Sequence, residues 1–340
     1  MNNKILIITH TQDNFSIEKV TEYIEQNGFG VIRFDVDLYP LQNKLTTVFQ
    51  NGKWITMLET AENTYRLDDI AAVWYRRAYN IGNGLKEELE PKFFGAAMGE
   101  IRNTLFGFLE SIDAYSLGKP SVYRRLDSKE EQLKVASKIG FKIPETCISN
   151  NPDEAKKFIL KHKNVIGKMQ TGFAIYEDGV ENVVFTNVIK EENLEELDSL
   201  MYCPMQFQRK IEKKKELRIT VVGHDIYAFE VDSQQFDDAK VDWRKDGVNL
   251  IDKWVRTELP AEIESKIIEL LDVYHVDYGA IDVIVSPEDE YYFIEINAAG
   301  EFFWLDNLTE DNLISKSIAD ILCDKAPRRN NKSLSYIEKS

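Results

Sequence analysis

Residues Tyr278–Gly300, with the sequence YGAIDVIVSPEDEYYFIEINAAG, decide the fold of this chain. The stretch predicts two strands, Gly279–Val285 and Tyr291–Ile296, joined by the polar turn SPEDE. Because side chains alternate across a strand, Glu295 and Asn297 are expected on one face of the second strand and its end. A carboxylate and an amide are therefore predicted to project together.

Asp282, in the first of these strands, can meet Glu295 and Asn297 because a short antiparallel connection brings the strands side by side. Two carboxylates and an amide oxygen would form a set of hard oxygen ligands suited to Mg²⁺. The alternative is an ordinary amphipathic hairpin whose polar residues face solvent. The apolar neighbours favour the metal site, because a polar group among them is costly unless it is paired or binds a cation.

The composition indicates a globular enzyme of two or three lobes. The chain has 340 residues, of which 43% are hydrophobic and 29% charged. No apolar run reaches the length needed to span a bilayer, so no membrane association is predicted. The three cysteines lie far apart and there are four histidines, which disfavours a disulfide framework or a zinc site. The expected compartment is the reducing cytoplasm.

The formal charge of −16 argues against binding nucleic acid through a general attraction to phosphates. It does not exclude a nucleotide, because a few lysines and arginines inside a cleft can outweigh the global charge.

The remaining sequence predicts an α/β protein. The strand–helix–strand opening has no G-x-G-x-x-G in its first turn, which gives little support to a dinucleotide site. Residues 121–142 are expected to form an Arg-rich loop and then a helix that begins at Asp127 as N-cap, with Glu130 at the capping-box position, and ends at Gly140. The other predicted elements are strands Lys4–Thr9, Gly28–Phe34, Ile70–Arg76, Val165–Met169, Leu217–Val222 and Ile226–Val231, helices Phe15–Gln26, Glu87–Leu117, Leu194–Met201 and Ala261–Val273, and hairpins around Asn51-Gly52 and Asp178-Gly179.

The carboxylate pattern resembles the metal-binding signature of the ATP-grasp superfamily: an Asp, twelve intervening residues, then Glu-x-Asn. Four further places, in the same chain order as in that superfamily, are similar to its motifs. The resemblance extends over about residues 120–320. The four places are Asp127-Ser128-Lys129 followed by Pro144, the strand Val165–Lys168, the segment Phe207–Ile211, and Glu216–Gly223 with the sequence ELRITVVG.

The resemblance implies ATP and Mg²⁺ as cofactors and assigns roles to individual residues. Asp282, Glu295 and Asn297 would hold the metal, while Lys129 and Lys168 would hold the α- and β-phosphates. The segment Gln208, Arg209, Lys210 and Ile211 would contact adenine, Glu216 would accept from the ribose hydroxyls, and Arg218 would face the transferred phosphoryl group. Catalytic roles would fall to Arg218, Arg244 and Lys168.

Each role has a structural alternative. Lys168 can form a structural ion pair, Lys129 can be a solvated helix lysine, and Glu216 can pair with Arg218 on the same strand face. Arg244, beside Trp243, can stack or pack on the surface instead of contacting phosphate or the acceptor. The run Lys213–Lys215 is expected to be a solvated loop, and His224 to be exposed. Arg209 departs from the family, which usually carries Glu there, and an arginine cannot accept from the adenine amino group.

A narrower resemblance points to the graspetide (microviridin-type) ligases, which close rings between side chains of a ribosomally made peptide. It rests on FQ with ELRITVVG and on three shorter segments. The three segments are Asp232–Gln234, Val241–Arg244 and Val73–Arg77. Arg76 and Arg77, at the end of Val73–Arg77, would bind a substrate carboxylate or form an ion pair between lobes.

The graspetide resemblance implies an ATP-grasp fold with an N-terminal pre-ATP-grasp α/β domain (1–120), a central lobe (121–205), a C-terminal lobe (206–327) and a flexible tail (328–340). The implied partner is a precursor peptide with a leader and an acidic, hydroxyl-rich core. The leader would bind the hairpin Phe173–Thr186 and the helix Leu194–Met201. A homodimer is left open.

The implied reaction activates Asp or Glu side chains as acyl phosphates and forms ω-ester or ω-amide crosslinks, releasing ADP and phosphate. Two alternatives remain: a ligase that adds an amino acid to a free peptide or a ribosomal protein tail, and a nucleotide-binding protein without catalytic activity.

Overall fold

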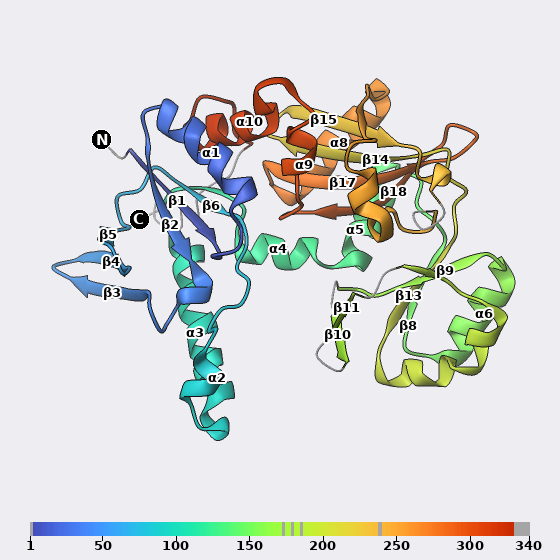
Figure 1. The fold of residues 1–340 in the computed structure, drawn as a ribbon, viewed down its shortest axis with the longest axis horizontal. Helices are drawn as coiled ribbons and strands as arrows, with labels where there is room; N and C mark the ends of the chain where they lie inside the picture. Colours follow the sequence, from blue (N-terminus) through green and yellow to red (C-terminus); the bar gives the residue numbers. More distant parts are fainter. Residues whose placement is uncertain (1–2, 172–173, 178–179, 184–185, 237–239, 330–340) are drawn as a thin grey trace.

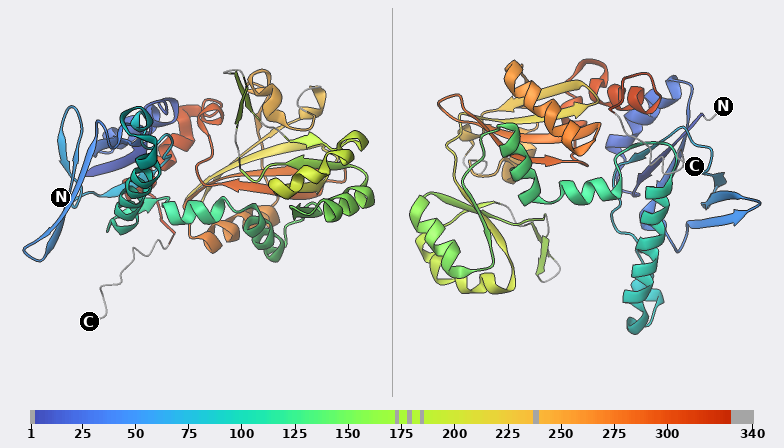
Figure 2. Two further views of the ribbon diagram at one scale, coloured as in Figure 1. Left: turned by 90° about the horizontal axis from the view of Figure 1, so that it is seen from below. Right: turned by 180° about the vertical axis from the view of Figure 1, so that it is seen from behind.

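The computed structural model of the protein describes residues 3–171, 174–177, 180–183, 186–236 and 240–329. Three main sheets organise these residues into three lobes, which we call the first, central and C-terminal lobes. Figure 1 shows the first lobe at one end and the other two lobes together at the opposite end. The two further views in Figure 2 show the same elongated arrangement.

A parallel sheet with the strand order β2-β1-β6-β7 forms the centre of the first lobe. In β1, Ile5 and Ile7 face one hydrophobic core, while Leu6 and Ile8 face another. A strand that is apolar on both faces is typical of a parallel sheet covered by helices on both sides, and this sheet agrees with the predicted α/β character of the opening segment. The elements are β1 (Lys4–Thr9), α1 (Phe15–Gln26), β2 (Gly30–Asp35), β6 (Ala72–Tyr75), α2 (Leu85–Glu88), α3 (Pro91–Ser111) and β7 (Tyr115–Leu117).

A separate antiparallel sheet, β3-β4-β5, extends from the first lobe. Its hairpin turns at Asn51 and Gly52, both with positive φ (52° and 75°), which confirms the predicted Asn-Gly turn. The prediction of one helix over Glu87–Leu117 is wrong at its end, because Tyr115–Leu117 pairs with β6 as a strand. The strands are β3 (Lys44–Gln50), β4 (Lys53–Glu59) and β5 (Thr64–Arg66).

The segment predicted as an Arg-rich loop is instead the helix α4 (Pro120–Leu126), which Figure 1 shows running between the lobes. Asp127 ends this helix, so it is not the N-cap of the next one. Helix α5 (Lys129–Ile139) has Ser128 as its N-cap, whose hydroxyl accepts from the backbone N–H of Glu131. The predicted cap was therefore one residue too early, although the predicted end at Gly140, with a left-handed backbone, is confirmed.

The central lobe is built on the antiparallel sheet β12-β9-β13-β8, with helix α6 packed against it. The predicted hairpin around Asp178-Gly179 is present as the antiparallel pair β10–β11, although Phe173 and the turn itself lie outside the described residues. The elements are β8 (Thr146–Ser149), α6 (Pro152–His162), β9 (Val165–Lys168), β10 (Ala174–Glu177), β11 (Val180–Val183), β12 (Asn187–Val188) and β13 (Met205–Arg209).

The predicted α-helix Leu194–Met201 is wrong. The chain forms two short 3₁₀ helices instead, η2 (Glu191–Glu195) and η3 (Leu197–Tyr202). Leu197 and Leu200 are the buried residues of η3, and their spacing of three matches the three-residue turn of a 3₁₀ helix.

The C-terminal lobe contains the antiparallel sheet β16-β15-β14-β17-β18. Helices α5 and α8 contribute to the hydrophobic core on one side of this sheet, with Leu133, Ala136, Ile263 and Ile267 among the buried residues. The strands and helices predicted here are confirmed to within about two residues. They are β14 (Lys215–Val222), β15 (Asp225–Val231), α8 (Ala261–Tyr274), β17 (Tyr278–Val285) and β18 (Tyr291–Asn297). Three further elements were not predicted: β16 (Val255–Arg256), α9 (Phe303–Asp306) and α10 (Leu313–Leu322).

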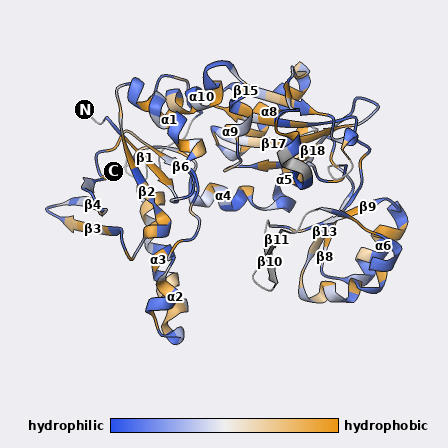
Figure 3. Ribbon diagram, in the orientation of Figure 1, coloured by the Kyte–Doolittle hydropathy of each residue, from blue (hydrophilic) through white to orange (hydrophobic). Residues whose placement is uncertain are grey.

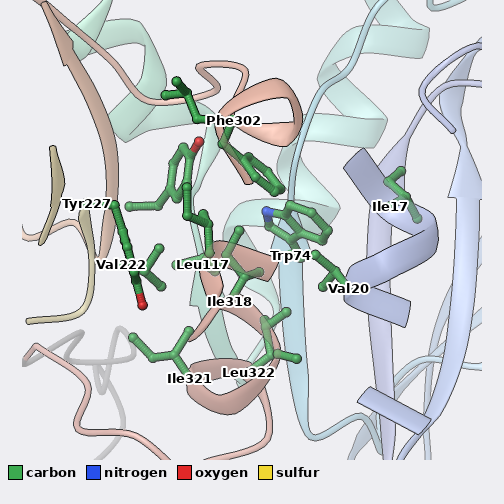
Figure 4. Close-up of a cluster of buried hydrophobic side chains, with 14 of the residues drawn as sticks. Ile17, Val20, Trp74, Leu117, Val222, Tyr227, Phe302, Ile318, Ile321 and Leu322 are labelled. Carbon is green, nitrogen blue, oxygen red and sulfur yellow. The ribbon is translucent and has the colours of Figure 1, made fainter. Parts of the chain in front are cut away.

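One hydrophobic core joins the first and C-terminal lobes. Figure 4 shows Trp74 and Leu117 of the first lobe packed among side chains from the end of the chain, including Phe302 and Ile318. Helix α10 lies beside α1, as Figure 1 shows in red and blue. The last helix of the chain therefore completes the core of the first lobe.

Hydropathy follows this layout. In Figure 3 the helices carry hydrophobic and hydrophilic residues in alternation along their length, which is typical of helices that pack one face against a core. Among the described residues, no helix combines the length and apolar character that crossing a membrane requires.

The predicted free tail does not begin at Arg328. Arg328 lies over the Tyr115 ring, with its guanidinium carbon 3.9 Å from the ring centre. Arg329 donates from its backbone to Asp277 (2.8 Å) and from Nε to Asp272 (2.7 Å). These two residues therefore anchor the end of the described chain, and residues 330–340 lie outside it.

Candidate functional site

Three charged side chains form a row across adjacent strands of the C-terminal lobe. Arg218 on β14 lies directly opposite Asp282 on β17, and Asp282 lies directly opposite Glu295 on β18. Residues opposite one another in an antiparallel sheet project from the same face. Asn297, two residues beyond Glu295, donates from Nδ2 to a Glu295 oxygen (3.2 Å). The structure thus places the three predicted oxygen ligands on one face.

A cleft lies between the central and C-terminal lobes. Three predicted site residues do not line it but bond to residues that do: Lys129 and Asn297 to Glu295, and Arg218 to Asp282. The predicted site residues that line it are Lys168, Gln208, Arg209, Lys210, Ile211, Glu216, Arg244, Asp282 and Glu295.

Lys168, at the end of β9, contributes the central lobe's positive charge to the cleft. Burial, together with the charges of Lys129 and Arg244, lowers the pKa of Lys168 to about 8, against the opposing effects of Glu295 and Asp282. Those two carboxylates form ion pairs with other cations, Glu295 with Lys129 and Asp282 with Arg218. This arrangement favours anion binding over the structural ion pair.

Lys129, the first residue of α5, is not the solvated lysine of the alternative reading. Its Nζ lies 2.7 Å from Oε2 of Glu295, and its side chain is 15% exposed. Burial alone would raise the pKa of Glu295, but the positive charges of Lys129 and Lys168 outweigh this effect and lower the pKa. Glu295 is therefore an ionised carboxylate at neutral pH.

The pKa of Asp282 shifts in the opposite direction from that of Glu295. Burial raises its pKa, Arg218 opposes this effect through an ion pair of 3.0 Å, and the charge of Glu295 raises the pKa further. Two buried carboxylates with opposite pKa shifts thus face each other across one sheet position. A divalent cation between them would relieve their repulsion.

The donor set fits magnesium. Within the described part of the chain, no group of three or more His, Cys, Asp and Glu side chains is arranged to hold a metal ion. Mg²⁺ is commonly held by one or two carboxylates together with phosphate oxygens and water. Asp282, Glu295 and the amide of Asn297 would supply that share of the ligands.

Glu216 and Arg218 do not pair with each other as the alternative proposed. Arg218 pairs with Asp282, and Glu216 pairs with Lys213 (3.0 Å). Lys213 also donates to the carbonyl of Val241 (2.9 Å) and lines the cleft, so its prediction as a solvated loop residue is wrong. Its position three residues before Glu216 was the signal that could have identified it.

Asp242 is a cleft residue that the sequence did not single out, although it lies within the quoted Val241–Arg244 segment. It accepts from Arg244 through both oxygens (2.8 and 2.6 Å) and from the backbone N–H of Thr186 in the central lobe (3.2 Å). Trp243 packs against Trp254, with ring centres 5.3 Å apart, instead of stacking on Arg244. Asp242 therefore orients Arg244 and joins two lobes.

Arg209 forms an ion pair with Glu145, the acid of the IPET segment. Its backbone N–H donates to the carbonyl of Glu145 (2.9 Å), and Gln208 donates to the hydroxyl of Thr146 (2.9 Å). The residue that departs from the family pattern is thus balanced by an acid on the neighbouring strand segment.

Arg76 and Arg77 contact the other lobe. Arg76 donates to the Glu301 carboxylate (2.7 Å) and to the Ala299 carbonyl (2.7 Å), and Arg77 donates to the same carbonyl (3.0 Å). Of the two predicted roles, the structure shows the ion pair between lobes. His224 is exposed, as expected.

Known proteins resemble the chain over nearly its whole length. A family model described as the MvdD pre-ATP grasp domain matches residues 4–124. A RiPP-associated ATP-grasp ligase of Chryseobacterium gregarium, solved with ADP and a leader and core peptide, is 80% identical, with 97% of this chain and 99% of that chain covered and a TM-score of 0.94.

Two structures from Microcystis aeruginosa MRC are also similar. The macrocyclase MdnC, solved with the precursor peptide MdnA, is 36% identical over 95% of this chain and 100% of that chain, with a TM-score of 0.85. The macrocyclase MdnB is 31% identical over 94% of this chain and 99% of that chain, with a TM-score of 0.79. No curated protein matches the chain.

The fold and the cleft define an ATP-grasp ligase, an ADP-forming class of enzyme that uses ATP and Mg²⁺. Within this class, the similarity extends through all three lobes to proteins from two bacteria. The chain belongs to the family of RiPP-associated ATP-grasp ligases that includes the macrocyclases MdnB and MdnC.

Proposed function

We propose that this enzyme closes rings in a ribosomally made precursor peptide. It activates an Asp or Glu side chain of the peptide with ATP as an acyl phosphate. A hydroxyl or amine of the same peptide then attacks the acyl carbon, forming an ω-ester or ω-amide bond and releasing phosphate. The row Arg218–Asp282–Glu295 at the cleft is the observation that carries the proposal.

Different residues of the site bind different parts of ATP. Lys129 and Lys168 hold the α- and β-phosphates, Glu216 accepts from the ribose, and the segment 208–211 contacts adenine. Asp282, Glu295 and Asn297 would hold Mg²⁺, which would supply positive charge against the phosphates. Arg218 and Arg244 face the transferred phosphoryl group and the acceptor.

Charge explains why cations dominate this site. A carboxylate that attacks the γ-phosphorus brings two anions together, so stabilising the transition state requires positive charge more than an acid or base. The Arg218 side chain is 8% exposed, which strengthens its interaction with developing charge relative to water. Its ion pair with Asp282 also holds it in place before the reaction begins.

The proposed partner is a precursor with a leader and an acidic, hydroxyl-rich core. The hairpin β10–β11 and the 3₁₀ helices η2 and η3 are the proposed leader-binding elements, on their place in the central lobe. The lobe boundaries at residues 120 and 205, the cytoplasmic location and the open question of a homodimer stay predictions; sedimentation of the purified enzyme tests the last.

The test uses the full-length enzyme, a candidate precursor, ATP and Mg²⁺. Asp282→Asn and Glu295→Gln are expected to abolish Mg²⁺-dependent ADP release, because the cation loses an anionic ligand. Asp289→Asn is the matched control, since Asp289 lies in the exposed β17–β18 connection and pairs with Lys214. The readouts are ADP release, intact peptide mass and thermal unfolding.

The wild-type product is expected to lose one water for each bond formed. A gain of residue masses would instead show that the enzyme extends a peptide, and peptide binding without ADP release would show a protein without catalytic activity. Full turnover by a folded Asp282→Asn/Glu295→Gln enzyme would refute the metal assignment.

A further inference from the structure

Arg76 is a buried residue of the first lobe that reaches the loop following β18. It stands at the end of β6, and its side chain is 1% exposed. Nη1 donates to the carbonyls of Ala299 (2.7 Å) and Gly300 (3.3 Å), and Nη2 donates to the Glu301 carboxylate (2.7 Å). One guanidinium therefore binds three consecutive residues of a loop more than 220 positions away in the chain.

The Glu301 carboxylate receives further donors from the same lobe. Arg77 forms an ion pair with its other oxygen, and the hydroxyl of Ser16 donates to Oε2 (2.9 Å). Asp13 lies 3.7 Å from Nε of Arg76 and keeps a second acid beside this guanidinium. Charge-assisted bonds of this kind are stronger than neutral ones and restrict geometry.

The loop held in this way carries groups of the reaction site. It begins directly after Asn297, one of the proposed magnesium ligands. Its Glu301 carbonyl accepts from Nη2 of Arg218 (3.1 Å), while Nη1 of Arg218 bonds to Asp282 (3.0 Å). The position of the Arg218 guanidinium is therefore set on one side by Asp282 and on the other by the loop.

Gly300 shows how little space separates the loop from Arg218. A Cβ atom added at Gly300 would lie 2.8 Å from Nη2 of Arg218 and would clash with Cβ of Ala280. The hydroxyl of Tyr278 fixes the same residue by donating to the Gly300 carbonyl (2.7 Å). A shift of the loop would thus be transmitted directly to Arg218.

We infer that Arg76, Arg77 and Glu301 are positioning residues for phosphoryl transfer, which act by holding the Asn297–Glu301 loop and, through it, Arg218. The inference rests on the proposed role of Arg218 at the transferred phosphoryl group. The first lobe thereby contributes to a reaction site whose described lining residues come from the other two lobes.

A role of Arg76 and Arg77 in binding a substrate carboxylate makes a different prediction. A substrate-binding arginine would change peptide affinity, whereas a positioning arginine changes the stabilisation of the transition state. The arginines' present partners, Glu301 and the loop carbonyls, favour the second role.

The experiment measures nucleotide binding by calorimetry, without peptide, for the full-length enzyme and its variants. The probes are MgADP alone and MgADP with aluminium fluoride, which imitates the transferred phosphoryl group. Glu301→Gln is expected to leave MgADP affinity within about twofold and to weaken binding of the aluminium fluoride complex by roughly tenfold to 100-fold, as found for residues that orient direct ligands.

A double-mutant cycle shows whether this effect passes through Arg218. In an Arg218→Lys background, Glu301→Gln is expected to change binding of the aluminium fluoride complex by no more than about twofold, because the group that it positions has already been altered. Asp68→Asn is the control, since Asp68 forms an exposed ion pair with Arg66 in the same lobe. Arg77→Lys serves as the second variant if Glu301→Gln unfolds early in a thermal scan.

Two results would overturn the inference: unchanged binding of the aluminium fluoride complex by a folded Glu301→Gln enzyme, or effects that multiply in the double variant. Neither depends on the peptide. A failure of the proposed ring closure would be seen separately, as an unchanged peptide mass.

Discussion

Lys168, the proposed phosphate-binding lysine, shows at the scale of a single residue how burial acts on a charge. Burial lowers the pKa of this amine to about 8 from an ordinary value of 10.5, and nearby cations act in the same direction. An ammonium that is poorly solvated, and whose neighbouring carboxylates form ion pairs with other cations, gains more from a bound phosphate than an exposed lysine would.

This pKa predicts a pH dependence of nucleotide binding. A bound phosphate favours the ammonium form, so binding should draw in a proton above pH 8, and MgADP affinity should fall by up to about tenfold per pH unit there. Calorimetry in buffers of different ionisation enthalpy measures the proton uptake. Lys168→Arg should remove both effects, and equal proton uptake by that variant would contradict the assignment.

The same shift has a consequence for stability. Because the folded-state pKa lies below the ordinary value, the unfolded chain binds more protons between pH 8 and 10.5. The contribution of Lys168 to the free energy of unfolding is therefore unfavourable below pH 8 and is relieved as the pH rises through this range.

At residue scale, the sequence predicted those site residues whose neighbours in the chain reveal them. Asp282 and Glu295 are carboxylates among apolar strand residues, and their placement on one face is confirmed. Asp242 has its cross-lobe partner, Thr186, 56 positions away, and Arg209 finds Glu145 64 positions away. Such partners cannot be recognised before the fold is known.

At the scale of elements, helix α5 is attached to strand β18 by one buried glutamine. Gln132 donates to the carbonyl of Ile296 (3.0 Å) and accepts from its backbone N–H (2.9 Å), and it also bonds to the carbonyl of Leu126. It thereby fixes the helix that carries Lys129 against the strand that carries Glu295.

Gln132→Leu is expected to destabilise the protein, because it leaves the N–H and carbonyl of Ile296 without their side-chain partner. Each unsatisfied buried group costs about 1–3 kcal/mol, so the free energy of unfolding should fall by at least about 2 kcal/mol. Urea unfolding measures the loss, with Gln26→Leu on the exposed side of α1 as the control. Similar midpoints for the two variants would contradict the bridging role.

The elements with strong periodicity were predictable, and the short ones were not. Strands β14, β17 and β18 alternate apolar residues as expected, and their bounds agree closely with the prediction. Helix α4 has seven residues, and its proline start was not recognised. The 3₁₀ helices and β7 depend on tertiary packing more than on local preference, since β7 has three residues and is held by pairing with β6.

At the scale of the whole molecule, the anchored chain end connects two lobes. Arg329 bonds to Asp272 and lies 3.8 Å from Asp277, while Tyr115 of the first lobe donates to the second Asp277 oxygen (2.9 Å). Burial raises the pKa of Asp277, with Arg329 among the groups that oppose this shift. The ionised form of Asp277 is therefore stabilised in part by the positive charge of Arg329.

Arg329→Ala should lower the free energy of unfolding at pH 7 by about 1–3 kcal/mol, because the buried Asp277 carboxylate loses one of the groups that oppose its raised pKa. The loss should shrink toward pH 5, since the raised pKa lets Asp277 take up a proton in the folded state and relieve the charge. Denaturant unfolding at both pH values is the measurement. A loss no larger than that of Lys253→Ala, an exposed lysine, would contradict it.

The overall class was predictable because its motifs follow one another in order, and the family comparison confirms it. What the motifs could not show is how the lobes share their interiors. The core between β1, α1 and α10 joins residues from both ends of the chain, and no local pattern in Leu313–Leu322 distinguishes a helix of the first lobe from one of the C-terminal lobe.

That shared core has a consequence for synthesis on the ribosome. The parallel sheet is translated well before α10, and the core on one of its faces, which α1 and α10 share, is complete only when α10 has left the exit tunnel. Until then Trp74 and its neighbours lack part of their cover. The first part to be translated is thus among the last to mature.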